Sequence, residues 1–503
     1  MRLGRNCRGR GGFGRSTADG LDDGRCTKVR ALYHRVTLLL LFHRATGVFE
    51  GKVVMSRAAP SATALAGRRR MVPSYDGEPE GFDVLVLDAH SRQSLAAVRS
   101  LGRAGLRVAT AECFAECDPA LAPLAFRSRY AGRSVVLPSF ADDAHAFAAG
   151  VVAFVGRNPT RVVLPTSDGS IAALIGWRRH LEALDCRLAL PSEDALAAAN
   201  DKGRTLMEAH RLGIAYPPTV CCNSLSDLPT ALGTVGFPAV LKPTRSWAPR
   251  TVERLNAVEV VNKGEAESAA RSFLHAGAGV LAQRWVGGRR EGATLFVEGG
   301  EVRASFAVVA HRTTPALGGA SVLRESVPVP PDLYDPSVRL VKALGLEGPC
   351  EVEYRRDESG CPLLMEINAR LAGPLETALR SGVDLPVMVW RWATGLPVTP
   401  PGDYRTVRMR WLRGDMRWLR DNFDRVGRPD SVSRARSLWD FGSEFARSTH
   451  YDCIDWRDPG PILAELRTTA RSVRLSSRGR PVHDRRNGTE AARPKRKVES
   501  GGS

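Results

Sequence analysis

The chain lacks the long apolar run that a membrane span requires. Its only strongly apolar block near the N-terminus, Leu38–Phe42, is far shorter than the roughly 20 residues of a spanning helix. A long basic stretch precedes that block, which is atypical of a secretory signal peptide. The ten cysteines show no zinc-ligand spacing, so we expect ordinary thiols in a reducing compartment. These absences predict a cytoplasmic protein with no membrane partner.

Several familiar signatures of enzyme classes are also missing. No Gly-X-Gly-X-X-Gly follows the first credible strand, Asp83–Asp88, which weakens a dinucleotide-binding interpretation. Neither a nucleophile elbow nor a Ser-His-Asp arrangement is readable. The sequence shows no internal repeat, and its 503 residues allow about two to four domains.

The formal net charge of +18 lies almost entirely in the two ends of the chain. Residues 1–80 contain 15 Lys and Arg against 7 Asp and Glu, and residues 466–503 contain 11 against 3. Each end therefore carries a net charge of +8, which leaves +2 for all the residues between them. Basic tails can bind nucleic acid or anionic membranes, and Arg493–Lys497 is similar to a nuclear localisation patch. Disorder is the commoner explanation for ends rich in Gly, Arg and Ser, so we predict no specific nucleic-acid partner.

We expect residues 1–80 to be a disordered or non-native extension and residues 476–503 to be a disordered basic tail. Residues 1–80 show little hydrophobic periodicity, and both Met55 and Met71 precede the first credible strand. The translation start is therefore open among Met1, Met55 and Met71.

The segment that follows has the pattern of a parallel-sheet domain. Asp83–Asp88 is a short apolar run typical of a buried parallel strand. Ser94–Ala104 carries apolar residues at helical spacing and Gly105–Thr110 follows as the next strand, which makes a βαβ unit. Arg161–Asp168 is a later strand whose exit we expect to line a substrate cleft. The pattern predicts an N-terminal α/β domain over residues 81–190.

Residues 351–370 are the most informative part of the chain. Two β-rich runs, Glu351–Tyr354 and Leu363–Arg370, flank the turn-like Asp357–Gly360 and predict a β-hairpin. The length of the loop fixes the register of a hairpin, and the register below assumes that Ser359–Gly360 is a two-residue loop.

In that register Glu353 lies opposite Glu366, Glu351 lies opposite Asn368, and all four share one face. The other face is predicted to carry the apolar core residues Val352, Tyr354, Met365 and Ile367. Carboxylates opposite one another are destabilising unless a positive group lies between them. Carboxylate and amide oxygens suit a hard cation such as magnesium, held together with substrate phosphates. Arg370, on the same face, could bind a phosphate bidentately. The plainer alternative is a solvated hairpin face with chance acids.

The Glu-hydrophobic-Asn-X-Arg ending at Glu366–Arg370 resembles the metal-binding end of the ATP-grasp enzymes. The resemblance implies magnesium or manganese at Glu353, Glu366 and Asn368, and ATP as the bound nucleotide. It also implies that Arg370 neutralises charge on the phosphoryl group during transfer.

Two lysines extend the resemblance. Ser192 is a good helix N-cap, and we expect one helix from there through Lys202 and Met207 to Gly213. Lys242 ends a short apolar strand. In the family, lysines at two such positions contact ATP phosphates, so the resemblance implies this role for Lys202 and Lys242. Taken alone, either lysine is more commonly a surface side chain.

Val280–Gly288 resembles the hinge strand whose backbone binds adenine in ATP-grasp proteins. The resemblance implies nucleotide contacts for Gln283, Trp285 and Val286. Relatives often have Glu at the Gln283 position. Glu291 is the candidate ribose contact, and the Arg289-Arg290 pair before it leaves the register open by one residue. Thr244–Pro249 lacks the glycine-rich, phosphate-covering loop of many relatives.

His311–Ser326 is similar to the His-Arg, then Gly-Gly-X-Ser, segment of a bacterial ATP-grasp subgroup described as carboxylate–amine ligase-like. The similarity implies substrate contacts for His311, Arg312, Ser321 and Arg324. Gly318–Gly319 would let backbone amides approach an anion closely. The plainer interpretation is a loop whose arginines face water.

The predicted fold class is α/β with an α+β ATP-grasp core. The N-terminal parallel-sheet domain at 81–190 precedes a two-lobed ATP-grasp domain at 191–400 and a mostly helical C-terminal appendage at 401–475. Within the appendage, Arg408–Asp415 is expected to form a strand and a turn, and Tyr451–Pro461 resembles the Asp-Pro-X-Pro closure common in the subgroup.

The resemblance implies an ATP- and magnesium-dependent, ADP-forming ligase that activates a small-molecule carboxylate as an acyl phosphate for attack by an amine. Lys202, Lys242 and Arg370 would neutralise the developing charge. Three alternatives stay open: a non-catalytic ATP-binding module, carbamoyl-phosphate-type or biotin-type chemistry, and nucleic-acid binding through the basic tails. No second ATP-grasp half or biotin-carrier segment is evident, which argues against the second alternative. The sequence identifies neither substrate, and it leaves the oligomeric state open, a homodimer included.

Overall fold

The computed structural model describes residues 81–113, 123–247, 254–315, 318–425 and 427–467. The predicted extension at 1–80 with its candidate start residues, the tail at 476–503 and the end of the Thr244–Pro249 segment lie outside these residues. No helix within the described ranges is long and apolar enough to cross a membrane.

Five parallel strands form the N-terminal sheet, in the order β3-β2-β1-β4-β5. The strands are β1 (Phe82–Val86), β2 (Val108–Glu112), β3 (Ala131–Val136), β4 (Thr160–Leu164) and β5 (Arg187–Leu188). The connecting helices are α2 (Arg92–Arg103), η1 (Ala125–Arg127), α3 (Ala144–Arg157), α4 (Asp168–Leu174) and α5 (Arg178–Glu182). β1 is the central strand of this order, and its residues Val84, Leu85 and Val86 are fully buried, as is usual for an apolar parallel strand. The predicted parallel-sheet domain is confirmed.

The single helix expected from Ser192 to Gly213 is two helices, α6 (Glu193–Ala199) and α7 (Lys202–Arg211). Ser192 caps α6 as predicted, since its side chain accepts from the backbone of Ala195. Asp201 interrupts the run because its side chain accepts from the backbone N–H groups of Gly203 and Arg204 and starts a new helix. Lys202 therefore lies in the first turn of α7 and not in the middle of a helix.

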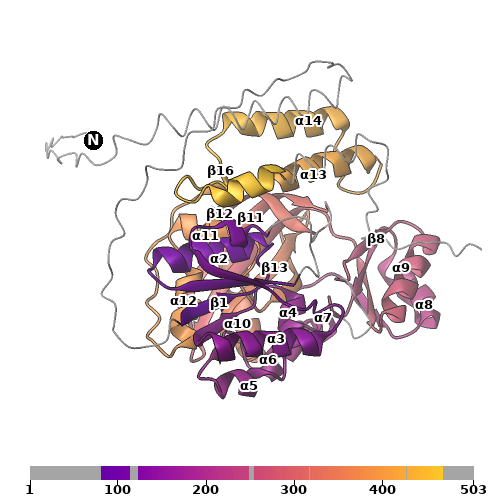
Figure 1. Ribbon diagram of the computed structural model, residues 1–503. Helices are drawn as coiled ribbons and strands as arrows, with labels where there is room; N and C mark the ends of the chain where they lie inside the picture. The colour runs from indigo at the N-terminus through magenta and orange to yellow at the C-terminus, as the bar shows by residue number, and fades with distance from the viewer. Residues whose placement is uncertain (1–80, 114–122, 248–253, 316–317, 426, 468–503) are drawn as a thin grey trace, which may run out of the picture. The chain divides into compact units, whose positions relative to one another are not determined.

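A four-stranded antiparallel sheet, ordered β6-β9-β7-β8, forms a small lobe. Its strands are β6 (Thr219–Cys222), β7 (Ala239–Pro243), β8 (Val258–Val260) and β9 (Val280–Arg284), with η2 (Leu225–Asp227), α8 (Leu228–Val235) and α9 (Lys263–His275). Figure 1 shows α8 and α9 side by side on one face of this sheet. Leu232 and Phe273 of these helices pack with Leu241 and Val280 of the sheet into a separate small core.

A seven-stranded sheet, ordered β14-β13-β10-β11-β12-β15-β16, forms the large lobe. Its strands are β10 (Arg289–Glu298), β11 (Glu301–Thr314), β12 (Ala320–Val327), β13 (Gly348–Arg356), β14 (Pro362–Asn368), β15 (Arg408–Arg410) and β16 (His450–Tyr451). The helices α10 (Pro331–Ala343), α11 (Leu375–Ser381) and α12 (Leu385–Ala393) follow β12 and β14. Phe296 and Phe306 of this sheet share a core with Val84 and Val86 of β1, so the N-terminal sheet and the large lobe are packed together.

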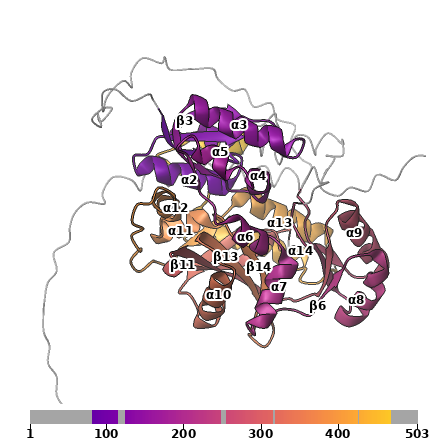
Figure 2. The same cartoon turned by 90° about the horizontal axis from the view of Figure 1, so that it is seen from below.

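The C-terminal segment is less helical than predicted, because β15 and β16 extend the large sheet. Its helices are α13 (Leu412–Asp424), α14 (Arg434–Ser443) and η3 (Glu444–Ala446). The strand expected within Arg408–Asp415 is present, but the expected turn is the first turn of α13. Both views show α13 and α14 lying beside each other (Figures 1 and 2).

The loop between α13 and α14 also contacts the small lobe and the cleft. Arg425 pairs with Glu259 of β8, and Arg428 Nη1 lies 2.9 Å from Glu265 Oε2 of α9. Asp430 lies 3.6 Å from Arg355 of β13. The C-terminal segment thereby ties the small lobe to the large one.

A buried ion pair fixes the chain's C-terminal segment to α2. Arg99 Nε lies 2.8 Å from Asp458 Oδ2, and neither side chain is exposed. The hydroxyl of Ser128 and the backbone N–H of Arg129 also donate to the Asp458 carboxylate, each at 2.8 Å. The Tyr451–Pro461 closure therefore packs against the N-terminal domain.

Asp458→Asn is expected to lower the free energy of unfolding by about 3–5 kcal/mol, because it leaves the Arg99 guanidinium buried without a counter-charge. Urea denaturation of the full chain measures this loss. Asp455→Asn is the matched control, since Arg103 in the neighbouring Arg103–Asp455 pair is 36% exposed and such pairs contribute about 1 kcal/mol or less. Equal losses in the two variants would contradict a structural role for the buried pair.

Candidate active site

Two acidic side chains face each other across β13 and β14, as predicted. Glu353 lies opposite Glu366, and Glu351 lies opposite Asn368. Asn368 Nδ2 donates to Glu353 Oε1 at 3.0 Å, so the amide orients one of the facing carboxylates. The predicted register is therefore confirmed at the position that carries the carboxylates.

The loop of this hairpin differs from the prediction. Five residues, Asp357–Cys361, join the strands instead of two. A bulge between Glu353 and Tyr354 offsets the longer loop and restores the predicted pairing at Glu353. Met365 is the extra residue: it lines a cleft, with its Sδ 4.0 Å from Lys242 Nζ. The prediction that Met365 belongs to the core was wrong because a bulge turns one side chain away from the alternating pattern.

Arg290 of β10 supplies the positive group that the facing carboxylates require. Its Nη2 atom lies 2.5 Å from Glu353 Oε1, and its Nη1 atom donates to the carbonyl of Gly319. Burial alone would lower the pKa of Arg290, but Glu353, Glu351 and Glu366 outweigh burial and raise it. Gly318 lines the cleft, and the contact at Gly319 is made by its carbonyl with Arg290. The predicted approach of the backbone amides to an anion stays a prediction.

Lys202 and Lys242 reach the same carboxylates from α7 and β7. Lys202 Nζ lies 3.9 Å from Glu366 Oε2 and 3.2 Å from Ser246 Oγ. Burial lowers the pKa of Lys242 to about 8, against the opposing effect of Glu366. Burial would raise the pKa of Glu366, but Lys202 and Lys242 outweigh it and lower the pKa. The two lysines and the hairpin therefore meet in one cleft.

Burial and the neighbouring Glu353 both act on Glu351, and together they raise its pKa. Of the three acids on this face, Glu351 is therefore the one disposed to hold a proton. Glu353 and Glu366 are left as the pair that faces the cleft.

Arg370 connects the hairpin to the N-terminal domain. Its Nη2 atom donates to Asn368 Oδ1 at 3.2 Å, and its Nε atom donates to Asp168 Oδ1 at 2.6 Å. Asp168 Oδ2 lies 3.1 Å from Arg254 Nη2. Burial would raise the pKa of Asp168, but Arg370 and Arg254 outweigh it and lower the pKa. Asp168 begins α4, in the segment after β4 that was expected to line a cleft. The sequence analysis did not single out its side chain, although its place after a parallel strand was an available signal.

The predicted hinge residues all line this cleft: Gln283, Trp285 and Val286. Gln283 Nε2 donates to Thr219 Oγ1 at 2.8 Å, which fixes the carboxamide toward β6. Arg355 Nη1 donates to the carbonyls of Val286 and Gly288, at 3.4 and 3.3 Å. The hinge backbone is therefore anchored to β13.

Glu291 does not reach the cleft. Successive side chains of β10 point to opposite faces, so Arg290 faces the carboxylates and Glu291 faces the side of its ladder partner Tyr354. Glu291 is 2% exposed, and Arg289 and Arg356 bind its carboxylate, with Arg356 Nη2 at 2.9 Å. Glu291 is therefore not among the residues that line the cleft, and Arg290 is the side chain of this pair that the register of β10 brings to it.

The predicted substrate contacts on β11 and β12 do not line the cleft either. Arg324 is fully buried; its Nη1 atom donates to Asp452 Oδ2 at 3.1 Å, and its Nε atom donates to Thr377 Oγ1 at 2.7 Å. Arg312 Nη1 lies 3.2 Å from Asp415 Oδ1. Both arginines bind acids of the C-terminal segment, so they hold that segment in place.

The two remaining candidates have similar local partners. His311 Nε2 lies 3.3 Å from Glu325 Oε2, and burial lowers the pKa of His311. Ser321 is buried opposite Thr313 in the β11–β12 ladder. Neither side chain is among those that line the cleft.

The cleft wall carries more positive than negative charge. Its cationic side chains are Lys202, Lys242, Arg254, Arg284, Arg290 and Arg355, and its carboxylates are Glu353 and Glu366. Six cations against two carboxylates suit a polyanion such as a triphosphate.

The same two carboxylates fit a magnesium ion only with help from the ligand. Among the described residues, no group of three or more His, Cys, Asp or Glu side chains is arranged to hold a metal. Magnesium is commonly held by one or two carboxylates together with substrate phosphates, and Glu353 and Glu366 meet that requirement. Asn368 contacts both Glu353 and Arg370, so it fixes this end of the site.

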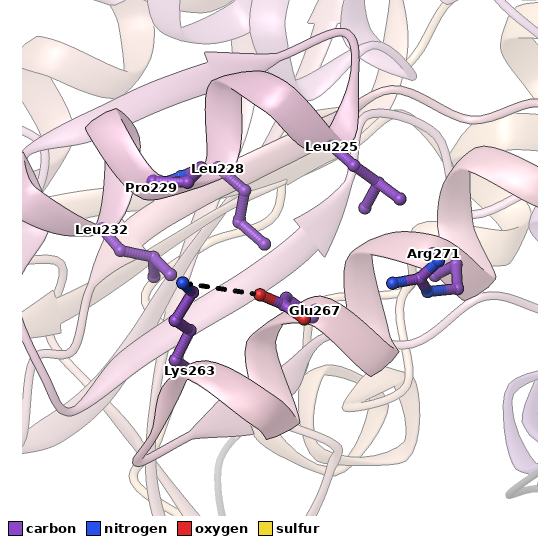
Figure 3. A pocket seen from close by; sticks show the side chains of 7 residues that line it. All are labelled: Leu225, Leu228, Pro229, Leu232, Lys263, Glu267 and Arg271. Carbon is purple, nitrogen blue, oxygen red and sulfur yellow. Dashed lines mark ion pairs between the residues drawn. The ribbon is translucent and has the colours of Figure 1, made fainter.

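A second pocket lies on the small lobe, between η2, α8 and α9 (Figure 3). It is lined by Leu225, Leu228, Pro229, Leu232, Lys263, Glu267 and Arg271. Lys263 and Glu267 are 3.8 Å apart, and the opposite wall is aliphatic. This pocket shares no residue with the cleft at the hairpin.

Known proteins resemble this chain in sequence and in fold. A family model described as ATP-grasp in the biosynthetic pathway with Ter operon matches residues 301–414. Probable alpha-L-glutamate ligase 1 of Shewanella sp. (strain MR-4) and probable alpha-L-glutamate ligase 2 of Shewanella sp. (strain MR-7) are each 30% identical over 182 residues. The match covers 35% of this chain and 57% of each relative, so the chain spans little more than half the length of these relatives.

Two solved structures share the fold at 15% identity and a TM-score of 0.50. One is a biotin carboxylase from Campylobacter jejuni in a complex with beta-gamma-ATP, matched over 65% of this chain and 75% of that one. The other is the biotin carboxylase domain of Hydrogenobacter thermophilus 2-oxoglutarate carboxylase with MgADP, matched over 65% and 73%. Residues 301–414 therefore match an ATP-grasp family model, and the two solved structures share the fold of this chain.

Proposed function

We propose that this chain is an ATP- and magnesium-dependent ligase that activates a carboxylate as an acyl phosphate and joins it to an amine. The observation that carries the proposal is the Glu353–Glu366 pair, which faces a cleft wall with an excess of cations and lies beside Arg370. This arrangement suits the transfer of a phosphoryl group, which depends mainly on positioning and charge neutralisation.

In the first step, a carboxylate oxygen of the acid substrate attacks the γ-phosphorus of ATP. The bond from the γ-phosphorus to the bridging oxygen breaks, and ADP leaves with that electron pair. In the second step, the neutral amine attacks the acyl carbon, and the carbon–oxygen bond to phosphate breaks. The amine substrate enters as an ammonium ion and loses two protons in forming the amide. The released phosphate takes one proton and solvent takes the other.

Each cation has a role in these steps. Lys202 and Lys242 would bind the phosphates of ATP, and Arg290 would balance the hairpin acids while the site is empty of nucleotide. Arg370 would hold the phosphoryl group as charge develops on it. Glu353 and Glu366, with Asn368 beside them, would hold magnesium, which supplies further charge neutralisation when bound.

The relatives named as alpha-L-glutamate ligases support amino acids as the first substrates to try. Pairs of the twenty protein amino acids, L-glutamate first, would be incubated with the full chain, ATP and magnesium. ADP formation that needs both partners, together with a new amide detected by mass spectrometry, is the expected result. MgATP binding without turnover, against any acid and amine, would instead favour a non-catalytic ATP-binding module.

Lys242 predicts a pH dependence for nucleotide binding. With a pKa of about 8, its ammonium is charged below pH 8 and loses its charge above it. MgATP affinity is therefore expected to fall as the pH rises from 8 to 9.5, and binding in that range takes up a proton. In the free protein the sign is opposite, because the lowered pKa means that burial penalises the charged form; stability should rise from about pH 8 toward the ordinary lysine value.

Calorimetric titration with MgATP across this pH range tests the prediction. Lys242→Met should bind more weakly and lose the pH-dependent part, whereas Lys263→Met, a change on the exposed face of α9, should keep it. The assignment would be refuted if the pH dependence survived in Lys242→Met. A cytoplasmic location and a homodimer stay predictions from the sequence.

A further inference from the structure

An amine substrate is an ammonium ion at neutral pH and requires an anionic contact close to the acyl phosphate. The hairpin acids are already engaged: Glu353 contacts Arg290 and Asn368, and Glu366 faces Lys202. Asp168 of the N-terminal domain is the carboxylate that contacts both Arg370 and the cleft residue Arg254.

The backbone that carries Asp168 is held by a buried network around Asp88. The N–H groups of Thr166 and Ser167 donate to Asp88 Oδ2 at 2.9 Å, and the hydroxyls of Ser167 and Ser170 donate to the same carboxylate at 2.8 and 2.7 Å. Asp88 itself has a left-handed φ of 58°, a conformation that costs energy in a residue other than glycine. This loop is therefore built to one geometry.

The position of the loop is that of a ligand site. β1 pairs with β2 on one side and β4 on the other, so the strand order reverses between β1 and β4. Ligands of parallel sheets bind beyond the carboxyl ends of the strands at such a reversal. Asp168 begins α4 directly after the β4 exit.

The two oxygens of Asp168 have unequal partners. Oδ1 accepts from Arg370, whose side chain is 10% exposed. Oδ2 pairs with Arg254, whose side chain is 42% exposed and which also lines the nucleotide cleft. A half-exposed pair contributes little, and incoming phosphates compete for Arg254. Oδ2 is therefore the oxygen that a second cation can take over.

We propose that Asp168 Oδ2 binds the ammonium group of the amine substrate, in the place that Arg254 leaves when the phosphates of ATP attract it. This inference rests on the proposed ligase function and names the group that selects a primary ammonium over a neutral nucleophile. Asp168 stays ionised at neutral pH because the two arginines outweigh its burial, so it binds the ammonium and does not serve as the base. The amine is thereby held beside Arg370, where the acyl phosphate forms.

Hydroxylamine separates this role from a general role in catalysis. It is neutral at pH 7 and converts acyl phosphates into hydroxamates, so it needs no ammonium site. The full-length protein would be assayed with MgATP and each protein amino acid as the acid, once with hydroxylamine and once with a second amino acid as the amine. For Asp168→Asn, the ratio of amide to hydroxamate rates at low amine concentration is expected to fall by about 10- to 100-fold, the range of a lost charge-assisted hydrogen bond.

The expected change is a rise in the amine concentration that gives half-maximal rate. If the amide and hydroxamate rates fell by the same factor, Asp168 would act only by positioning Arg370, and the ammonium site would be wrong. An unchanged ratio with unchanged rates would also overturn it. No hydroxamate from the wild-type protein with any acid would overturn the ligase function itself, and the ammonium site with it.

Asp194→Asn is the matched control, since Asp194 also lies in the first turn of a helix, α6, and is exposed. It should leave both rates and their ratio unchanged. The thermal midpoint with MgATP reports whether Asp168→Asn is folded. Should that variant not fold, Asp168→Glu keeps the charge, displaces the oxygens and allows the same comparison.

Discussion

Replacing Glu366 with Gln is expected to lower ATP turnover by at least about a hundredfold, because outer partners of metal ligands alone cost about 10- to 100-fold. Glu366 is the more open of the two facing acids, at 27% side-chain exposure against 9% for Glu353, so it is the carboxylate best placed to meet a metal–nucleotide complex. Gln keeps the size of the side chain and one oxygen but removes the charge. The hairpin would then carry one negative charge fewer beside Lys202 and Lys242.

The thermal midpoint of the full chain, with ATP and with or without magnesium, measures the binding part of this expectation. Wild-type protein should gain stability from ATP that depends on magnesium, and Glu366→Gln should lose the magnesium-dependent share. Glu301→Gln is the control, because Glu301 is 71% exposed on β11 and pairs only with Lys342 among the described residues. Magnesium-dependent stabilisation of normal size in Glu366→Gln, with turnover intact, would show that Glu366 does not hold the metal.

The hairpin shows how far local pattern could be carried. The alternation of Glu351, Val352 and Glu353 against Glu366, Ile367 and Asn368 predicted the correct pairs, because a face that buries apolar residues fixes the register strongly. The predicted two-residue loop was wrong, but the strand pairs were still correct. The observed five-residue loop and the bulge at Met365 together give the same pairs as a two-residue loop. The wrong loop length and the missed bulge shift the register in opposite directions, so the burial pattern alone gave the correct pairs.

The errors fall where a side chain's partner is distant in the sequence. Arg324 and Arg312 were expected at a substrate, but Asp452 and Asp415 of the C-terminal segment bind them. Nothing near these arginines in the chain reveals those acids, since the contacts form only when β15 and β16 extend the sheet.

The expectation that Glu291 faces the nucleotide cleft differs from the structure for another reason. A shift of one residue along β10 exchanges the two faces of the strand, and the resemblance alone did not fix that register. The pairing of Gly292 with Glu353 places Arg290, two residues before Gly292, on the carboxylate face. Arg290 could have been found by extending the hairpin's alternation to a third strand, but the neighbour of β13 was not readable from the sequence.

Replacing Arg370 with Lys is expected to lower kcat by about 10²- to 10³-fold while MgATP binding stays close to that of the wild type. Arg370 uses two directions of its guanidinium at once, Nε to Asp168 at 2.6 Å and Nη2 to Asn368 at 3.2 Å. A lysine carries the same charge on a single nitrogen and cannot keep this fork geometry. Charge alone would therefore be kept, and only the orientation toward the phosphoryl group would be lost.

Steady-state turnover and the MgATP-dependent thermal midpoint, measured on the same preparation, separate these two contributions. Arg303→Lys is the control. The Arg303 side chain is 42% exposed and pairs with Glu298, where β10 ends and β11 begins. A retained kcat in Arg370→Lys would mean that a positive charge suffices at this position, and the fork between Asp168 and Asn368 would then be structural. A lost kcat with retained nucleotide binding would place Arg370 at the group in transfer, because binding senses the ground state whereas kcat senses the charge that develops after it.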